Sequence, residues 1–66
     1  MNFTDYYQTL SHAEKILFKK KVIADNEWSH DTFHRRFRSG KFNPGEILII
    51  ENIIATKSYL KVEENV

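Results

Sequence analysis

Four side chains with binding chemistry lie close together in the middle of the chain: His30, His34, Arg35 and Arg38. Arginine presents a planar fork of donors that pairs with carboxylates and phosphates, and histidine can donate hydrogen bonds or bind a metal. His30 and His34 are four residues apart, which places both on one face of a helix at a spacing that can hold zinc. Because a third ligand has no obvious place, we expect two exposed histidines and no metal site.

A short helix over residues 29–38 would position these groups. Ser29 is a good N-cap, since its hydroxyl can accept a backbone N–H of the first turn, and Ser39-Gly40-Lys41 is expected to end the helix, with Gly40 as the usual C-terminal residue. Phe33 and Phe37 are four residues apart and share a face. The helix therefore has an aromatic underside and a His/Arg outer side, and a helix of this kind can lie in a DNA groove.

The preceding helix begins with a capping box of Ser11 and Glu14 and is expected to end at about Asp25 or Asn26, with Asn26 as its left-handed C-terminal residue. Phe18 and Val22 form a narrow apolar strip on one side. The broader apolar face, which we expect to meet the core, comprises Ala13, Ile16, Leu17, Ile23 and Ala24.

A third helix is predicted from Pro44 to about Lys57, because Asn43 is a good N-cap, Glu46 is at the capping-box position and proline suits the first helical position. Leu48 and Ala55 lie on the side of this helix opposite the apolar arc. They are either ordinary surface residues or contacts to the C-terminal tail or to a second copy of the chain. The wide apolar arc of the helix, expected to make it the central core helix, comprises Ile47, Ile49, Ile50, Ile53 and Ile54.

The pattern predicts one all-α domain of 66 residues, a compact bundle of three to four helices that contains a helix-turn-helix. We expect the core to span residues 12–57 and the tail, residues 58–66, to be partly flexible. Residues 1–10 are expected to form a turn or two of helix or an ordered arm. No apolar run approaches a membrane span and no signal pattern opens the chain, so a soluble cytoplasmic protein is expected.

Charge is distributed unevenly although the net charge is only +1. Residues 12–42 hold eight Lys and Arg against four Asp and Glu, whereas residues 43–66 hold two against four. This indicates one positive face or a merely lopsided solvated surface. The chain has no cysteine, no serine with supporting His and Asp, and no Gly-rich phosphate loop. We therefore expect no enzyme, no cofactor and no small-molecule substrate.

Two patterns resemble the turn and recognition helix of small bacterial and phage helix-turn-helix proteins of the Cro/repressor (XRE-like) kind. They are the run Trp28-Ser29-x-x-Thr32-Phe33-x-Arg35 and the spacing Gly40-x-x-x-Pro44 before an Ile-rich helix. The resemblance covers roughly residues 12–56. It departs from the family pattern where Glu27 holds the turn position that usually carries glycine.

The resemblance implies sequence-specific binding of double-stranded DNA and regulation of transcription, of phage or mobile-element type. Arg35 or Arg38 would pair with a guanine edge, a contact worth about 1–3 kcal/mol of discrimination. Such modules usually bind as dimers, for which Leu48, Ala55 and the tail are candidate contacts. The outer side of the helix would comprise Ser29, His30, His34, Arg35 and Arg38, with phosphate contacts from Ser29, His30, Lys41 and some of Lys15, Lys19, Lys20 and Lys21.

Two alternatives stay open at this stage. The chain could keep the fold without binding DNA and act as a small helical protein-interaction module, using its apolar and acidic C-terminal region. Alternatively, its aromatic residues could be platforms on which single-stranded bases stack rather than core residues. The aromatics concerned are Trp28, Phe33, Phe37 and Phe42.

Overall fold

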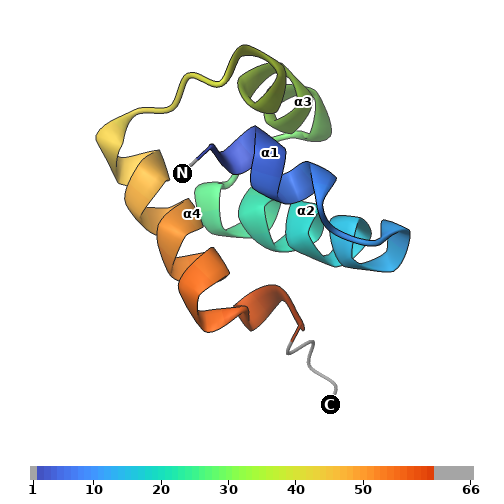
Figure 1. Ribbon diagram of the computed structural model, residues 1–66. Helices are drawn as coiled ribbons and strands as arrows, with labels where there is room; N and C mark the ends of the chain where they lie inside the picture. Colours follow the sequence, from blue (N-terminus) through green and yellow to red (C-terminus); the bar gives the residue numbers. More distant parts are fainter. Residues whose placement is uncertain (1, 61–66) are drawn as a thin grey trace.

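The computed structural model describes residues 2–60, which form four α-helices followed by a short 3-10 helix (Figure 1). No strand occurs within these residues, and the predicted all-α class is confirmed. None of the helices in this part of the chain is both long and apolar enough to pass through a lipid bilayer. The elements are α1 (Phe3–Gln8), α2 (His12–Asn26), α3 (His30–Ser39), α4 (Pro44–Thr56) and η1 (Ser58–Leu60).

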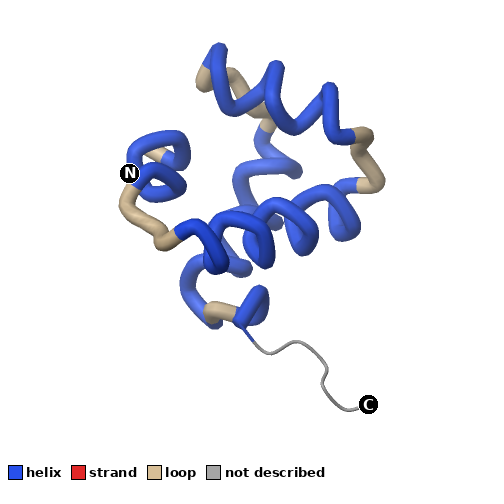
Figure 2. Tube along the Cα trace, turned by 90° about the vertical axis from the view of Figure 1, so that its right-hand side faces the viewer, coloured by secondary structure: helices blue, strands red, loops and turns tan. Residues whose placement is uncertain are grey.

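Helix α2 lies at the centre of the domain. It contacts α1, α3, α4 and η1, whereas the sequence favoured α4 for this position. Figure 1 shows α3 above α2 and α4 to its left, and Figure 2 shows α2 and α3 joined end to end by a short turn. Every other element is thus held in place through α2.

The core is built mainly from aromatic rings. Phe18 is fully buried. The centre of its ring lies 5.2–6.1 Å from the ring centres of Tyr6, Tyr7, Phe37 and Tyr59. The core reaches beyond residues 12–57, the predicted range, at both ends. Its buried apolar residues are Phe3, Phe18, Val22, Phe33, Phe37, Ile50, Ile53 and Tyr59.

The predicted core face of α2 was wrong. Phe18 and Val22, assigned to a minor strip, are fully buried, whereas Ile16 is 40% exposed and Lys20, in the middle of the predicted face, is exposed. Packing from neighbouring elements explains the burial of Phe18, because aromatic rings of α1, α3 and η1 surround it. The rest of the predicted face follows the same pattern: Ala13 and Ala24 are exposed, and Leu17 and Ile23 are half-buried.

The two ends of the described chain are tied to the core by hydroxyl groups. The Tyr6 and Tyr59 hydroxyls share a hydrogen bond of 2.6 Å, and Thr4 Oγ1 donates to the Phe37 carbonyl at 2.6 Å. Within residues 1–10, Phe3–Gln8 form a short helix, which was one of the two predicted possibilities. Of the tail predicted over residues 58–66, Ser58–Leu60 form a short 3-10 helix, and residues 61–66 lie outside the described residues.

Stability should depend on pH through Tyr59. Burial, together with the hydrogen bond that Tyr59 shares with Tyr6, raises the pKa of the Tyr59 hydroxyl above its ordinary value of 10.0. The native state therefore holds this proton more tightly than the unfolded state, so the stabilisation is complete below pH ~10 and is lost as pH rises above it. We expect the free energy of unfolding to fall less steeply above pH ~10 in Tyr59→Phe than in the wild type. Urea titrations at a series of pH values measure the free energy of unfolding of both proteins. Equal slopes against pH above pH ~10 would contradict the prediction.

The turn between α2 and α3 depends on one strained residue. Helix α2 ends with Glu27 in the left-handed conformation (φ 59°), one residue later than the Asn26 predicted for this role. The backbone N–H of Glu27 donates to the Ala24 carbonyl at 3.3 Å, and that of Trp28 donates to the Ile23 carbonyl at 3.0 Å. Only three residues, 27–29, therefore separate the two helices.

Glycine at position 27 should stabilise the domain. A side chain in the left-handed region costs about 1–2 kcal/mol, and glycine avoids this cost at the expense of a more flexible unfolded chain. We expect Glu27→Gly to raise the free energy of unfolding by about 0.5–1 kcal/mol in chemical denaturation. Glu51→Gly, at an exposed position inside α4, is the control and should lower it by about 1 kcal/mol. Equal losses in both variants would contradict the strain at Glu27.

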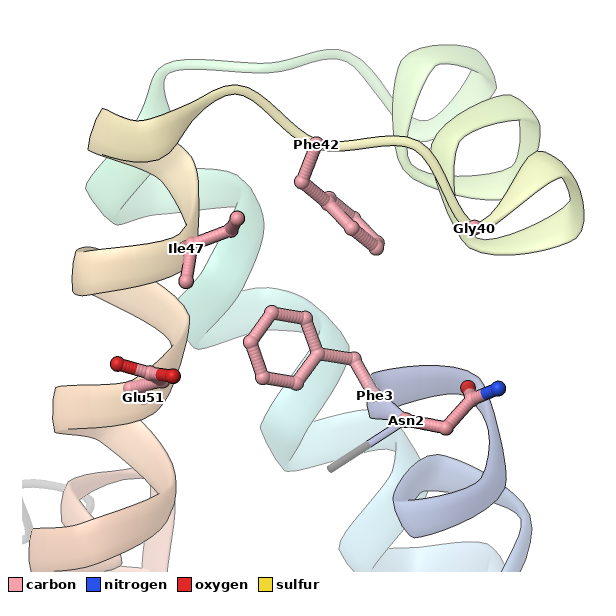
Figure 3. Close-up of a pocket in the computed structure, with 6 residues that line it drawn as sticks. All are labelled: Asn2, Phe3, Gly40, Phe42, Ile47 and Glu51. Carbon is pink, nitrogen blue, oxygen red and sulfur yellow. The ribbon is translucent and has the colours of Figure 1, made fainter.

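The connection from α3 to α4 is fixed by packing and by capping. The centre of the Phe42 ring lies 5.3 Å from that of Phe3 and 5.2 Å from that of Phe37. Phe42 and Phe3 line an open depression of about 470 Å³ between the N-terminal end of α1, the connection and α4, and Figure 3 shows their rings on two sides of it. Asn43 and Glu46 form the predicted capping box at the start of α4. These contacts fix the C-terminal end of α3 relative to the core.

Candidate nucleic-acid interface

Helix α3 begins and ends as its sequence predicts. The Ser29 hydroxyl accepts the Thr32 backbone N–H at 3.1 Å, which satisfies one of the free donors of the first turn. At the other end Gly40 is left-handed (φ 74°), and its N–H donates to the Arg36 carbonyl at 2.8 Å. The helix is therefore a rigid ten-residue element, His30–Ser39.

The underside of α3 is part of the core. The rings of Phe33 and Phe37 stack 4.3 Å apart, and only 1% and 5% of these residues are exposed. Trp28 and Phe42 are half-buried and pack against the same cluster. Phe33 and Phe37 therefore cannot stack single-stranded bases, because stacking needs an open ring face.

All six predicted site residues are exposed. His30, His34 and Arg38 recur every four residues and so form one line along α3, with Arg35 beside it. Within residues 2–60 the two ion pairs are Lys21–Asp25 and Arg36–Glu46, and neither uses Arg35 or Arg38. The outer face of α3 is defined as Ser29, His30, His34, Arg35 and Arg38, and Lys41 follows in the connection to α4.

Arg36 differs from its neighbours, since it points to the core side. Its Nη1 donates to Glu46 Oε1 at 2.7 Å, and its guanidinium carbon lies 5.7 Å from the centre of the Trp28 ring. Glu46 is buried and also accepts the Asn43 N–H at 2.9 Å. Arg36 thus joins α3 to α4 and to the turn, and it leaves the outer face to Arg35 and Arg38.

The four lysines of α2 are not equivalent. Lys20 is exposed, whereas Lys21 pairs with Asp25 at 3.5 Å. Lys15 Nζ lies 5.5 Å from the centre of the Tyr7 ring and donates to Gln8 Oε1 at 3.4 Å. Lys19 is half-buried. Lys15 is therefore directed toward α1, next to the groove described below.

A groove between α1 and α3 was not predicted. It has a volume of about 380 Å³ and is lined by Thr4, Tyr7 and Gln8 of α1 and by Phe33, His34, Phe37 and Arg38 of α3. Two predicted site residues, His34 and Arg38, thus share a surface with Gln8. The sequence carried no signal for Gln8, because the pattern of residues 1–10 does not say which helix they pack against.

The histidines do not gather into a metal site in the part of the chain that the structure describes: no group of three His, Cys, Asp or Glu residues in residues 2–60 is placed to hold a metal ion. Comparisons of the chain with protein-family models, with curated protein sequences and with solved structures each find no match. Any function must therefore be argued from the outer face of α3, the turn before it and the charges around it.

Proposed function

We propose that this domain binds double-stranded DNA by placing α3 in the major groove, and that it regulates transcription in this way. The observation that carries the proposal is the two-sided character of α3. Phe33 and Phe37 fix its underside in the core, while its outer face presents two arginines and two histidines without an ion-pair partner among residues 2–60. A helix is about 10–12 Å across, and the major groove of B-DNA is about 12 Å wide.

The turn before α3 supports the proposal. A helix, a three-residue connection and a second helix that presents polar side chains is the arrangement of a DNA-binding helix-turn-helix. Glu27 adopts the left-handed conformation at the position where the Cro/repressor pattern usually carries glycine. A left-handed residue at this position supports the likeness between the two turns.

Each polar group of the outer face has a role in this proposal. Arg35 and Arg38, three residues apart, read guanine edges, and each bidentate contact is worth about 1–3 kcal/mol of discrimination. Ser29 and His30 at the N-terminal end of α3, and Lys41 beyond its C-terminal end, contact phosphates. His34 lies between the two ends of α3 and faces the same major groove of the DNA.

A second copy of the chain completes the proposal. Leu48 is 68% exposed on the outer side of α4, and Ala55, two turns further on, is exposed as well. We assign this strip to the contact between two copies on neighbouring half-sites, since two-fold symmetric dimers are usual for this kind of module. The same strip is what a protein-interaction module without DNA binding would use, so the two functions differ in whether α3 takes part.

Amide chemical shifts recorded with a random-sequence duplex separate these functions. We expect the changes to concentrate on residues 29–41, with weaker effects at Leu48 and Ala55 from dimer formation. Changes confined to Leu48, Ala55 and their neighbours, or no change at low salt, would contradict DNA binding. An equal concentration of a polyanion without bases, such as heparin, is the control for unspecific charge attraction.

A further inference from the structure

The groove between α1 and α3, called here the α1–α3 groove, brings together side chains from separate helices. His34 and Arg38 come from α3, and Gln8 comes from α1. The only other polar groups of the lining are Thr4, whose hydroxyl donates to the Phe37 carbonyl, and the hydroxyl of Tyr7. No carboxylate lines the groove, although Asp5 and Asp31 lie on the same two helices.

A third helix adds a positive charge next to this groove. The ammonium group of Lys15 on α2 lies 5.5 Å from the centre of the Tyr7 ring, and Tyr7 lines the groove. Lys15 Nζ also donates to Gln8 Oε1 at 3.4 Å. The Gln8 amide oxygen thus faces Lys15, and its NH₂ group, a donor, is directed away from that ammonium. The surroundings of the groove are rich in donors and positive charge.

Such surroundings suit an anion rather than a base. The rings of Phe33 and Phe37 beneath the groove are almost completely buried, so they present no face for stacking. Arginine and lysine donate hydrogen bonds and accept none, which matches the oxygen atoms of a phosphate group. The groove also adjoins the outer face of α3, with which it shares His34 and Arg38.

We propose that the α1–α3 groove holds a phosphodiester of the DNA backbone, with Arg38 and His34 on one side, the Gln8 amide on the other and Lys15 at its edge. The proposal rests on the proposed function, because it names the part of the same ligand that meets α1. It makes Gln8 a contact that fixes the angle of α3 in the major groove. Arg38 then divides its donors between a base edge and the backbone.

Gln8→Glu tests the groove directly. It puts a negative charge beside the phosphodiester, and the exposed position of Gln8 leaves the fold intact. Asn52→Asp, which adds the same charge at an exposed position on α4, is the matched control. We expect duplex affinity at 0.1 M salt to fall about tenfold in Gln8→Glu and by less than about twofold in Asn52→Asp, with a smaller difference at higher salt.

Each remaining outcome has a definite meaning. Equal affinities in the two variants would contradict phosphodiester binding in the α1–α3 groove, whereas DNA binding by the wild type would still stand. Failure of the wild type to bind any duplex would overturn both the groove and the proposed function. Inorganic phosphate is the second probe. If submillimolar phosphate shifts the Gln8 and Arg38 side-chain signals while the Gln8→Glu variant binds duplex normally, the groove is a site for free phosphate and the phosphodiester proposal is wrong.

Discussion

Replacing Phe18 with alanine is expected to lower the free energy of unfolding by about 3–5 kcal/mol. The Phe18 ring is fully buried and lies against four other aromatic rings, so its removal loses both apolar burial and ring contacts and leaves a cavity. A domain of this size has a modest total stability, so much of the variant population should be unfolded at room temperature. Circular dichroism during urea denaturation measures the loss.

The control for this prediction is Ile16→Ala on the same helix. Ile16 belongs to the face that the apolar pattern favoured, but it is 40% exposed and should cost less than about 1 kcal/mol. The pair of variants therefore tests which side of α2 faces the core. A larger loss from Ile16→Ala than from Phe18→Ala would mean that α2 is rotated relative to the arrangement described here.

Removing both arginines of the outer face should abolish most duplex binding. We expect Arg35→Gln combined with Arg38→Gln to weaken binding to a specific site at least about 30-fold, because two charged base contacts of about 1–3 kcal/mol each are lost. Fluorescence anisotropy of a labelled duplex measures this effect. Both side chains are exposed and neither forms an ion pair within residues 2–60, so the free energy of unfolding should change little.

A double variant with the same change in charge separates contact from general attraction. Lys57→Gln combined with Lys61→Gln removes two positive charges from the C-terminal part of the chain. This variant should bind duplex within about threefold of the wild type, since neither lysine belongs to the outer face of α3 as defined above, and salt screens charges that make no direct contact. Equal losses in the two double variants would mean that only net charge matters and that α3 reads no bases.

Local signals predicted the helix boundaries well. The start of α2 at Ser11 and Glu14, the start of α3 at Ser29 and the end of α3 at Gly40 all depend on hydrogen bonds between neighbouring residues. Such bonds are determined by a few consecutive side chains, so they can be recognised in the sequence. The same holds for the capping box that opens α4.

Packing between helices could not be recognised in the same way. The core face of α2 was predicted from the number of apolar side chains on each side of the helix. Phe18 is buried for another reason, because aromatic rings from α1, α3 and η1 surround it. Arg36 is the same residue type as its neighbour Arg35, and only the position of Glu46 on α4 shows that Arg36 forms an ion pair there and is half-buried. The α1–α3 groove has the same origin, since no local pattern places Gln8 beside Arg38.

The measurement that tests DNA binding most directly is the anisotropy of a labelled random-sequence duplex, titrated with the wild-type chain at 50, 100 and 200 mM salt. The account predicts a Kd of about 10⁻⁴–10⁻⁶ M that weakens steeply as salt increases, because each phosphate contact releases a counterion. Binding lost in the double arginine variant and kept in the double lysine variant would assign it to α3. No binding at 50 mM salt would contradict the account and leave the exposed strip of Leu48 and Ala55 as the functional surface.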